Sequence, residues 1–505
     1  MHSDFVETIF FHARNAPNNP AISTLGTIVS YRMLAQGILR VEEKIRASGL
    51  KQGDTAGILV NYPIGHFAII CALHRLGIAS VSIYPDQIAS LNEILVDAVL
   101  ADEQAPDVPV RTVKVDDSWF KSGSGELPLR ASDVRPSPDD VARYVLSSGT
   151  TGQAKVISLT FRSVQERLES YACRLASPGW ERLVCIPSLN TNYGYCFAIT
   201  SVWLGKMVCF AGYQFARQAV ILYQAHVLVS STQQIAGMVR DQEENYMPLD
   251  SLRAVHIGGS VSYAPLIARI RLLICTTLLC GYGSTEAGTV AFAPALRLQG
   301  FDNAVGITTP WVRVEVVDEN KRPIARGSEG EVRISAYGQG HRYRRVTDSE
   351  AEIERGEWFY PGDRGILYKN GMLVILGRLN DIINRGGVKI APETIEEFAK
   401  TLGGIRDAAA VGVLSPLGIE QVWLGIGVDP AVDIEMPTLY AAFREKMPNT
   451  VPDRIHVVHE IPRNTLGKIV RRDLQRLLAE VELTTTGTAG MSLSDQDVKG
   501  SGSRS

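Results

Sequence analysis

The sequence predicts an α/β fold, with a large amino-terminal domain of parallel-rich sheets and helices, and a smaller carboxy-terminal α+β domain. Two observations support it. Between residues 30 and 84, helical apolar periodicity alternates with short apolar runs. Strand, helix and strand in that order imply a parallel sheet with right-handed crossovers. From 311 to 376, short β segments are separated by Gly, Asn and Asp turns, which predicts hairpins or a small β-barrel-like subdomain.

The amino-terminal elements follow from local patterns. Residues 31–49 carry apolar side chains at helical spacing and end on a glycine, a helix stop. Residues 55–60 and 79–84 are predicted to be buried strands, with a helix at 64–77 between them. The stretch 101–140 is rich in Asp, Pro, Ser and Gly, so we expect a long surface connection with one short strand. The α/β alternation then resumes and continues to about residue 290.

Three segments are predicted along the chain. The main boundary is placed near Asn380, which gives domains at 1–379 and 380–483. The last segment, 484–505, is polar and lacks periodicity, so we expect a disordered tail.

Composition narrows the class of protein. The 505 residues carry a net charge of −3, from 51 basic and 54 acidic residues, which gives no broad reason to bind nucleic acid or an anionic membrane. The seven cysteines are scattered without a CxxC pair, which argues against a disulfide framework or structural zinc. The first residues lack a signal-peptide pattern, and the apolar stretches at 57–73 and 193–213 are interrupted by polar residues. We therefore expect a cytoplasmic protein without a membrane span.

The first chemical motif runs from Tyr144 to Lys155. A buried strand leads into a loop of glycine and hydroxyl residues that a lysine closes. Such a loop offers backbone N–H groups, hydroxyl donors and a cation to phosphate, although its spacing is not that of a Walker A loop. The alternative is a flexible turn. The residues assigned to phosphate are Ser147, Ser148, Gly149, Thr150, Thr151, Gly152 and Lys155.

A second motif is GYGSTE, formed by Gly281, Tyr282, Gly283, Ser284, Thr285 and Glu286 after an apolar run. Tyr282 is suited to stack on a base, and the Glu286 carboxylate to hold a divalent cation against phosphates. The alternative is an ordinary strand-to-loop turn in which the glutamate caps the backbone.

Two further turns carry charged side chains. Asp363 in YPGD has a carboxylate that can accept both hydroxyls of a ribose, or it is a turn aspartate. Lys468 follows a glycine turn at the start of an amphipathic helix. Read alone, a lysine there is a solvated helix-start residue.

In order, spacing and residue type, these segments together resemble the adenylate-forming (AMP-binding) superfamily. Its members include acyl- and aryl-CoA synthetases, luciferases and adenylation domains of nonribosomal peptide synthetases. The resemblance covers about residues 8 to 480. It implies an AMP-forming ligase that uses ATP and Mg²⁺ to activate a small carboxylic acid. The acyl group would then pass to CoA, or to the phosphopantetheine of a carrier protein.

The resemblance also implies roles for single residues. Thr150, Thr151 and Lys155 would hold the pyrophosphate end of ATP, and Thr285 would contact the α-phosphate. The adenine pocket would be formed by Tyr282, Gly258, Gly259 and Ser260. Asp363 and Arg378 would bind the ribose, Glu286 would coordinate Mg²⁺, and Lys468 would bridge the carboxylate and the α-phosphate.

The family turns its carboxy-terminal domain about one hinge residue between the two half-reactions. The resemblance implies that Asn380 is this hinge, and Asn tolerates unusual backbone angles. The loop of Gly386 and Gly387 would then approach the thiol, and Lys389 would contact phosphate before the turn.

The resemblance implies that the acid pocket lies near residues 187–194. This segment contains no carboxylate, so a buried substrate ammonium would lack a partner and an α-amino acid is disfavoured. Asn190 and Asn192 are candidates to hydrogen-bond a substrate hydroxyl or carbonyl beside Tyr193, or they are simply loop residues. In the phosphate loop, Ala154 and Val156 replace the proline and glycine usual in the family, without removing a phosphate donor.

The leading prediction is an acyl- or aryl-CoA ligase. The first alternative is a stand-alone adenylation enzyme that loads a carrier protein. A second alternative, of another class, is a nucleotide-binding homologue that has lost catalysis. Retention of Lys155, Glu286, Asp363, Arg378 and Lys468 argues against that alternative, because a protein that only binds nucleotide does not need Lys468.

Overall fold

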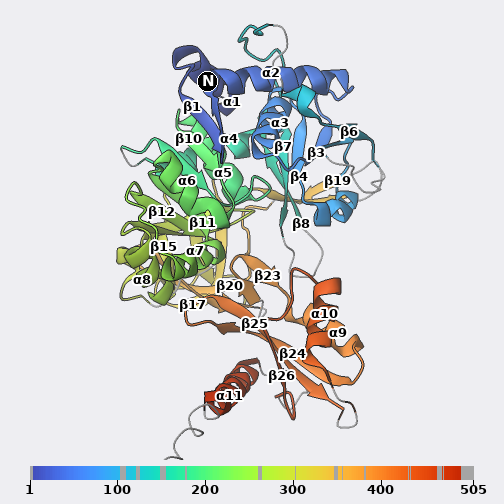
Figure 1. Ribbon diagram of the computed structural model, residues 1–505, viewed down its shortest axis with the longest axis vertical. Coiled ribbons are helices and arrows are strands. Elements are labelled where there is room, and N and C mark those ends of the chain that lie inside the picture. Colours follow the sequence, from blue (N-terminus) through green and yellow to red (C-terminus); the bar gives the residue numbers. More distant parts are fainter. Residues whose placement is uncertain are drawn as a thin grey trace, which may run out of the picture. The chain divides into compact units, whose positions relative to one another are not determined.

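The computed structural model describes residues 4–102, 110–120, 125–147, 155–176, 179–259, 264–301, 303–345, 351–354, 356–379, 383–429, 432, 434–462, 469 and 471–490. These residues form two compact units. The first extends to Leu379, and the second comprises the described residues from Ile383 onwards. Each unit is described separately (Figure 1).

The larger sheet of the first unit has 13 strands among the described residues. Its middle strands are parallel, from β1 through β10, β9, β11 and β12 to β13. The order of all 13 strands is β16 (Val312–Val317), β17 (Glu329–Ala336), β20 (Asp363–Leu367), β21 (Met372–Arg378), β15 (Ala304–Thr308), β14 (Gly288–Pro294), β13 (Leu278–Ser284), β12 (Ala254–Gly258), β11 (Val227–Ser231), β9 (Arg182–Cys185), β10 (Met207–Phe210), β1 (Pro20–Thr24) and β2 (Thr27–Ser30).

The β segments predicted between 311 and 376 are antiparallel strands of this same sheet. They continue it beyond β13 and pack around an apolar cluster of their own, which includes Val314, Val332 and Leu373. The hairpin pattern of the sequence therefore corresponds to an extension of the parallel sheet. Glycines at tight points, such as Gly306 with φ +137°, let neighbouring strands approach closely.

The second sheet of the first unit has eight strands in the described part of the chain. Its strands pair in parallel from β7 to β6 and antiparallel from β7 to β19, so β7 is the strand at which the pairing changes. Its order is β19 (Ala351–Glu354), β18 (His341–Arg345), β8 (Lys155–Thr160), β7 (Val141–Ser147), β4 (Ala79–Ser82), β3 (Thr55–Leu59), β5 (Ala98–Ala101) and β6 (Thr112–Lys114). The predicted strands at 55–60 and 79–84 are β3 and β4, and β6 is the short strand expected within 101–140.

Three helices pack against the two sheets of the first unit. They are α3 (Pro63–Arg75), α4 (Phe161–Arg174) and α5 (Asn192–Trp203). Two of them, α3 and α4, contact both sheets. Helix α3 contacts β3 and β4 of one sheet and β1 of the other, while α4 contacts β7, β8 and β14. Helix α5 packs on α4, β9 and β10. Helices covered on both sides must be apolar nearly all round, and every residue of α3 from Ile64 to Arg75 is buried.

The remaining helices of the first unit cover its outer faces. Helix α2 (Tyr31–Ala47) is the predicted helix at 31–49, and its amino terminus is capped by Ser30, whose hydroxyl accepts from the Met33 amide. It packs on α1 (Phe5–Asn15) and α3. Helices α6 (Ala216–Tyr223), α7 (Thr232–Glu244) and α8 (Ala264–Leu273) pack on β9, β11 and β13 respectively (Figure 1).

The second unit is α+β. Its three-stranded sheet has the order β24 (Ile405–Leu414), β25 (Glu420–Val428) and β26 (Arg454–Val457). The other elements are the hairpin of β22 (Ile383–Arg385) and β23 (Val388–Ile390), with helices α9 (Pro392–Thr401), α10 (Met436–Lys446) and α11 (Arg471–Gly490). Apolar residues such as Ile395, Leu424 and Phe443 form its core.

The predicted start of the tail at 484 needs correction. Helix α11 continues through 484–490 to Gly490. Once a helix exists, each added residue gains one hydrogen bond without a new nucleation cost, so polar composition alone did not locate its end. The rest of the predicted tail lies outside the described residues.

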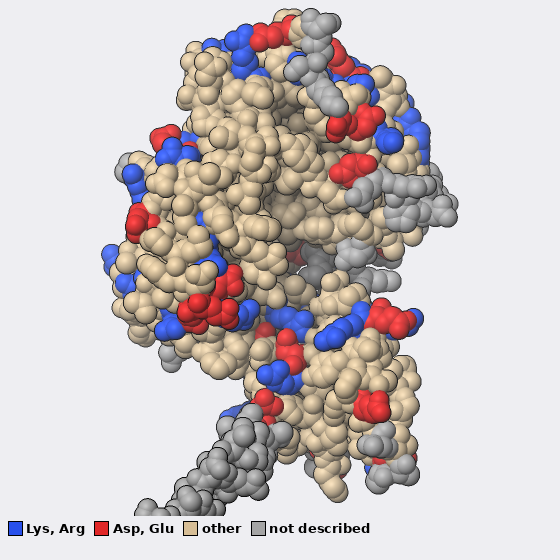
Figure 2. All heavy atoms as spheres, viewed as in Figure 1, with Lys and Arg blue, Asp and Glu red and all other residues tan. Residues whose placement is uncertain are grey.

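Charges of both signs are interspersed over the face shown in Figure 2. This agrees with the near balance of acidic and basic residues. No described helix is both long and apolar enough to cross a membrane. All seven cysteines are described and unpaired, and only Cys173 is exposed.

Candidate active site

The predicted phosphate loop joins two antiparallel strands. Ser147 ends β7, and Lys155 begins β8 opposite it in the register. Lys155 is therefore held by the hairpin, half-buried at its open end. Val156, where the family usually has glycine, is a buried residue of β8 paired with Leu146, so the side chain at this position belongs to the core. The loop residues Ser148, Gly149, Thr150, Thr151, Gly152 and Ala154 lie outside the described residues.

The GYGSTE segment is mostly strand rather than turn. Residues Gly281 to Ser284 lie within β13, which pairs with β14 in a tight hairpin. A Cβ at Gly283 would lie only 2.0 Å from the carbonyl oxygen of Gly288, so no other residue fits there without moving the hairpin. The turn itself holds Thr285 and Glu286, both half-buried. The Ser284 hydroxyl accepts from the Ala287 amide at 3.0 Å and closes it.

Two residues predicted to contact the nucleotide meet directly. The Tyr282 hydroxyl, on β13, donates to the carboxylate of Asp363 at 2.5 Å. Asp363 is 3% exposed at the start of β20, opposite Arg378 at the end of β21 in the register. Only the backbone of Arg378 is described. A phenol, a carboxylate and the end of β21 thus come together from segments far apart in the sequence.

Sequence reasoning missed the residue that anchors the Thr285–Glu286 turn. Arg167 on α4 is 1% exposed. Its guanidinium donates to the carbonyl oxygens of Thr285 at 2.8 Å, Glu286 at 2.5 Å and Gly338 at 2.7 Å. The Gly340 amide also donates to the Glu286 carbonyl, at 2.7 Å. The backbone of the turn is therefore fixed from two sides.

The predicted acid-pocket residues have different environments. Asn190 is bound locally, its side-chain oxygen accepting from the Ser188 hydroxyl at 3.1 Å. Asn192 is buried at the start of α5, and its side-chain oxygen accepts from Arg167 at 3.0 Å. Asn192 therefore helps to position the Thr285–Glu286 turn. Tyr193 instead faces the carboxyl end of β12, with its ring 3.2 Å from where a Cβ of Gly258 would lie.

A second buried arginine holds the strand that precedes the phosphate loop. Arg143 on β7 donates to the Ser82 hydroxyl at 3.1 Å and the Leu189 carbonyl at 2.8 Å. Its guanidinium also lies 4.3 Å from the centre of the Tyr195 ring. The residue ties β7 to the segment at 187–191 and to α5.

A third buried arginine, Arg174, lies against β13. A Cβ at Gly281 would come within 2.9 Å of its Nη2 atom. One signal for these residues was present in the sequence. On α4, Val164, Arg167, Tyr171 and Arg174 share one face at helical spacing, so two arginines stand in what is otherwise a core stripe.

The remaining predicted residues divide between the two units. Gly259 lies just beyond β12 with φ +98°, while Ser260 lies outside the described residues. Gly386 and Gly387 form the turn between β22 and β23 at φ +60° and +104°, and Lys389 lies in β23. These three belong to the second unit. Lys468 and Asn380 lie outside the described residues.

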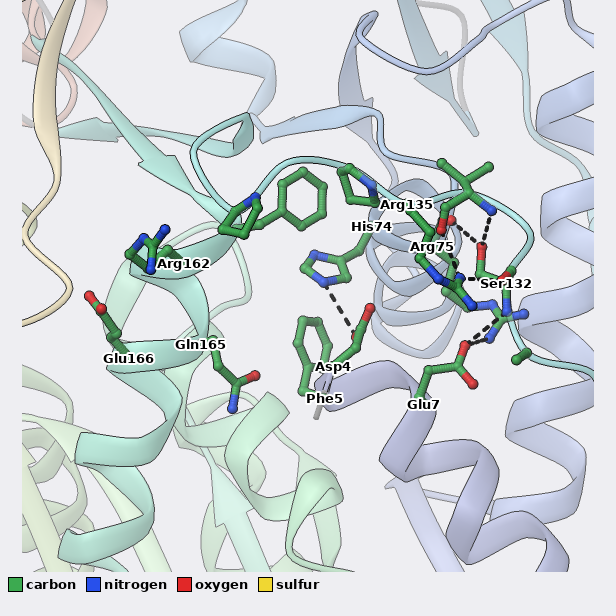
Figure 3. A pocket seen from close by; sticks show the side chains of 15 residues that line it. Asp4, Phe5, Glu7, His74, Arg75, Ser132, Arg135, Arg162, Gln165 and Glu166 are labelled. Atoms are coloured by element: carbon green, nitrogen blue, oxygen red, sulfur yellow. Dashed lines mark hydrogen bonds and ion pairs between the residues drawn. The ribbon is translucent and has the colours of Figure 1, made fainter. Parts of the chain in front are cut away.

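A cavity of 410 Å³ lies elsewhere in the first unit. Figure 3 shows His74 directed at Asp4, and Arg75 at Glu7. None of the predicted site residues lines it. The guanidinium of Arg75 also binds the carboxylate of Glu42. Tyr282 and Asp363, which are predicted to bind nucleotide, lie at another place, on β13 and β20.

Residues 9–343 match the family described as AMP-binding enzyme. The chain belongs to the AMP-binding enzyme family. It is similar to the fatty acid–[acyl-carrier-protein] ligase ScoC of Streptomyces coeruleorubidus, with 27% identity over 93% of the chain and 95% of that protein. It is also similar to the long-chain-fatty-acid–CoA ligase of Salmonella typhimurium, with 23% identity over 94% of each. With such relatives, this AMP-binding enzyme is an AMP-forming ligase.

Solved structures of the same fold agree. A double mutant of the o-succinylbenzoate CoA synthetase MenE of Bacillus subtilis, bound with its product analogue, matches with a TM-score of 0.77 over 94% of the chain and 98% of that protein, at 19% identity. The same enzyme in complex with ATP and magnesium matches with a TM-score of 0.66 at 18% identity. The large first and small second units of this AMP-binding enzyme thus correspond to the adenylate-forming fold.

The described residues fit ATP and Mg²⁺ chemically. Within the described part of the chain, no three His, Cys, Asp or Glu residues gather as a metal cage. Mg²⁺ needs no such cage, because it is bound through one or two carboxylates together with substrate phosphates. The anchored turn carries Glu286, the residue predicted to provide one carboxylate. Tyr282 and Asp363 are paired beside the glycines of β12 and β13. An aromatic ring can stack on a base, and a carboxylate can accept hydrogen bonds from the hydroxyls of a ribose.

Proposed function

We propose that this AMP-binding enzyme activates a small carboxylic acid with ATP and transfers the acyl group to CoA. The activation step is supported by one observation. The Tyr282 hydroxyl is hydrogen-bonded to Asp363, and Tyr282 lies on the strand that leads into the anchored turn of Thr285 and Glu286. The CoA acceptor is supported by the similarity to the Salmonella ligase, which is a CoA ligase.

In the first half-reaction, a carboxylate oxygen attacks the α-phosphorus of ATP. A phosphorus–oxygen bond forms to the acid, the bond to the β-phosphate oxygen breaks, and pyrophosphate leaves. The thiolate of CoA then attacks the acyl carbon, and AMP leaves. The carboxylate is already ionised at neutral pH, so this chemistry needs positioned positive charge more than it needs a general base.

We assign roles to this chain's residues accordingly. Tyr282 faces the base and orients Asp363, which takes the ribose hydroxyls together with Arg378. Lys155 and the phosphate loop bind the pyrophosphate end, while Thr285 binds the α-phosphate. Glu286 would hold Mg²⁺, which supplies charge neutralisation at the phosphates. Lys468 would bridge the carboxylate and the α-phosphate.

The second unit completes this proposal. Asn380 would be the hinge about which residues 380–483 turn between the half-reactions. The turn of Gly386 and Gly387 would then approach the thiol, and Lys389 would contact phosphate before the turn. Glycines at positive φ leave that turn without side chains, which suits close approach of a pantetheine arm.

A carrier protein is the second candidate acceptor. The relative ScoC, similar over 93% of the chain, is a fatty acid–[acyl-carrier-protein] ligase. Both acceptors present the same phosphopantetheine thiol, so the first half-reaction is common to the two. The difference lies in whether a protein surface is also recognised.

The test is acid-dependent release of AMP and pyrophosphate from ATP and Mg²⁺. The acids offered are short, medium and long fatty acids, benzoates, hydroxycinnamates, dicarboxylates and amino acids, with Lys468→Ala as control. CoA and a phosphopantetheinylated carrier protein are then offered separately. Thioester on CoA supports the proposal, and thioester on the carrier alone supports the second candidate. ATP binding without release for every acid would favour a non-catalytic homologue.

A further inference from the structure

Arg174 is a buried cation without a carboxylate partner among the described residues. It ends helix α4 and is 5% exposed. Its Nη1 atom donates to the Thr289 hydroxyl at 3.1 Å. Its Nε and Nη2 atoms are buried and have no acceptor in the described part of the chain. Since buried polar groups in folded proteins are nearly always hydrogen-bonded, two free donors on one guanidinium call for an explanation.

Aromatic rings surround this guanidinium. Its carbon lies 5.0 Å from the centre of the Phe197 ring, and 5.5 Å from those of Tyr171 and Phe292. Cation–π attraction offsets part of the cost of burying the charge. Ring faces accept no linear hydrogen bond from the edge of a guanidinium, so the Nε and Nη2 donors remain unsatisfied.

Two other buried polar atoms belong to the same cluster. They are the hydroxyl of Tyr193, which interacts with the Arg174 guanidinium, and the Nδ1 atom of His256. Both rings pack edge to face on Phe197, at 5.0 and 5.4 Å between centres. Buried polar atoms of Arg174 and His256 around one phenylalanine, with the Tyr193 hydroxyl beside the guanidinium, need a hydrogen-bonding partner. Together they describe a subsite built to receive hydrogen-bonding atoms.

The cluster lies at the carboxyl ends of β12 and β13. Nη2 of Arg174 approaches Gly281 on β13, and the Tyr193 ring approaches Gly258 at the end of β12. Ligands of open α/β sheets bind at the carboxyl ends of parallel strands, and β12 and β13 are parallel neighbours. Gly281 directly precedes Tyr282, so the guanidinium lies one residue along the strand from the proposed nucleotide residues.

The chemistry of the cluster selects an anion. Burial lowers the pKa of His256 well below its usual value, so its imidazole is neutral. Burial also raises the pKa of Tyr193 to about 12, so its phenol is neutral as well. The guanidinium is therefore an uncompensated positive charge. Its two free N–H groups match the two oxygens of a carboxylate, which guanidinium binds as a fork.

We propose that Arg174 binds a second carboxylate, at the end of the substrate acid remote from the group that is activated. The substrate class is thus a dicarboxylic acid, and Arg174 is a specificity-determining residue. This inference rests on the proposed function. An unsubstituted alkyl tail in the same place would leave both donors unpaired. Plain monocarboxylic acids of matched length are therefore poor substrates, because a site built for a polar group rejects analogues that lack it.

The experiment measures acid-dependent ATP–pyrophosphate exchange with matched pairs of acids, adipate against hexanoate and terephthalate against benzoate. Wild-type enzyme should favour one or both diacids over the matched monoacid by at least about tenfold in kcat/KM. Arg174→Met keeps an unbranched side chain between the rings, and should raise KM for the diacid by about tenfold or more while leaving KM for ATP unchanged. Arg174→Lys, which keeps the charge, should retain part of the preference.

Arg217→Met is the matched control. Arg217 is another buried arginine of the first unit, on α6, and donates to the carbonyl oxygens of Asp241 and Asn245. Its replacement should lower stability without changing the preference between paired acids. This control separates loss of a buried arginine as such from loss of the subsite.

Each outcome decides one question. Exchange with monoacids at the same rate as with diacids in wild-type enzyme would overturn the inference and leave the proposed function standing. Absence of exchange with every acid would count against the proposed function. In that case the melting temperature of wild-type protein is measured with each acid. An increase with diacids and not with monoacids supports the subsite, and no difference between them overturns it. If Arg174→Met fails to fold, the wild-type preference and Arg174→Lys still decide.

Discussion

The guanidinium of Arg167 donates a hydrogen bond to the main-chain carbonyl of Glu286 across 119 positions of sequence. The backbone of Glu286 is thereby held from α4, and its carboxylate takes no part in this bond. Burial lowers the pKa of Arg167, but an arginine stays charged at any physiological pH. The anchor is therefore a permanent cation bound to carbonyl oxygens, and the position of the turn depends on it.

We expect Arg167→Lys to disturb this turn. A lysine presents one ammonium and cannot reach the carbonyls of Thr285, Glu286 and Gly338 together. The unsatisfied buried acceptors should lower stability by about 2–4 kcal/mol, and acid-dependent exchange should fall at least about tenfold. Urea unfolding of the variant and of wild type measures the loss of stability. The rate of acid-dependent ATP–pyrophosphate exchange measures the loss of activity. Arg162→Lys, on the exposed side of the same helix and paired with Asp139, should change neither; equal losses in both variants would contradict this anchoring.

Tyr282→Phe keeps the ring and removes the hydrogen bond to Asp363. Losing a bond to a charged group costs about 1.5–3 kcal/mol. We therefore expect KM for ATP to rise about tenfold while the KM for the acid stays within about twofold. Steady-state kinetics with each substrate varied in turn measures this split. The control is Tyr213→Phe, at an exposed tyrosine of the same unit. An unchanged KM for ATP in Tyr282→Phe would show that the hydrogen bond between Tyr282 and Asp363 does not contribute to nucleotide binding.

Glu286→Gln removes a carboxylate but keeps shape and hydrogen-bonding capacity. Because Mg²⁺ prefers charged oxygen ligands, half-maximal activity should require about tenfold more Mg²⁺. Titration of Mg²⁺ at fixed ATP measures this requirement. Glu126→Gln, in an exposed ion pair with Arg32, should leave the titration unchanged. A metal requirement equal to wild type would exclude Glu286 as the ligand.

Stability should depend on pH through His66. Burial, assisted by the charge of Arg143, lowers its pKa from 6.5 to about 3. The unfolded chain therefore takes up a proton below pH 6.5, whereas the folded protein does so only near pH 3. The contribution to stability is present above 6.5 and is lost progressively as the pH falls between these values.

His66→Gln should remove this contribution while keeping a hydrogen-bonding partner for Ser82, which His66 contacts at 2.8 Å. We expect urea unfolding of the variant to depend less on pH between about 6.5 and 4 than that of wild type. His459→Gln, at an exposed position, serves as control. Identical pH dependence of wild type and His66→Gln would show that this ring is not protonated on unfolding.

Much of the fold was accessible from periodicity. The helix at 31–49 and the strands at 55–60 and 79–84 are α2, β3 and β4, because burial of one face imposes a period on the sequence. The sequence does not predict that the antiparallel strands continue the parallel sheet. Tertiary packing decides which strands pair, for example at Ile307 and Met372. The end of α11 at Gly490 was missed for a local reason, the low cost of extending an existing helix.

The candidate site was accessible only in part. Tyr282 and Asp363 were singled out by motif, and the structure brings them together. Arg167 and Arg174 were not found, because an arginine inside a helical core stripe can equally project its charge to solvent. Asn192, predicted beside the acid, proves to be bound to Arg167. The roles of the phosphate loop, Asn380 and Lys468 remain predictions.

Formation of an acyl-adenylate is tested most directly by isotope transfer. An accepted acid labelled with oxygen-18 in its reacting carboxylate is incubated with ATP, Mg²⁺ and CoA, and the AMP released is analysed by mass spectrometry. Attack of the carboxylate on the α-phosphorus predicts AMP that carries one heavy oxygen, in wild-type enzyme and not in Lys468→Ala. Unlabelled AMP, or release of ADP and phosphate instead, would contradict the account.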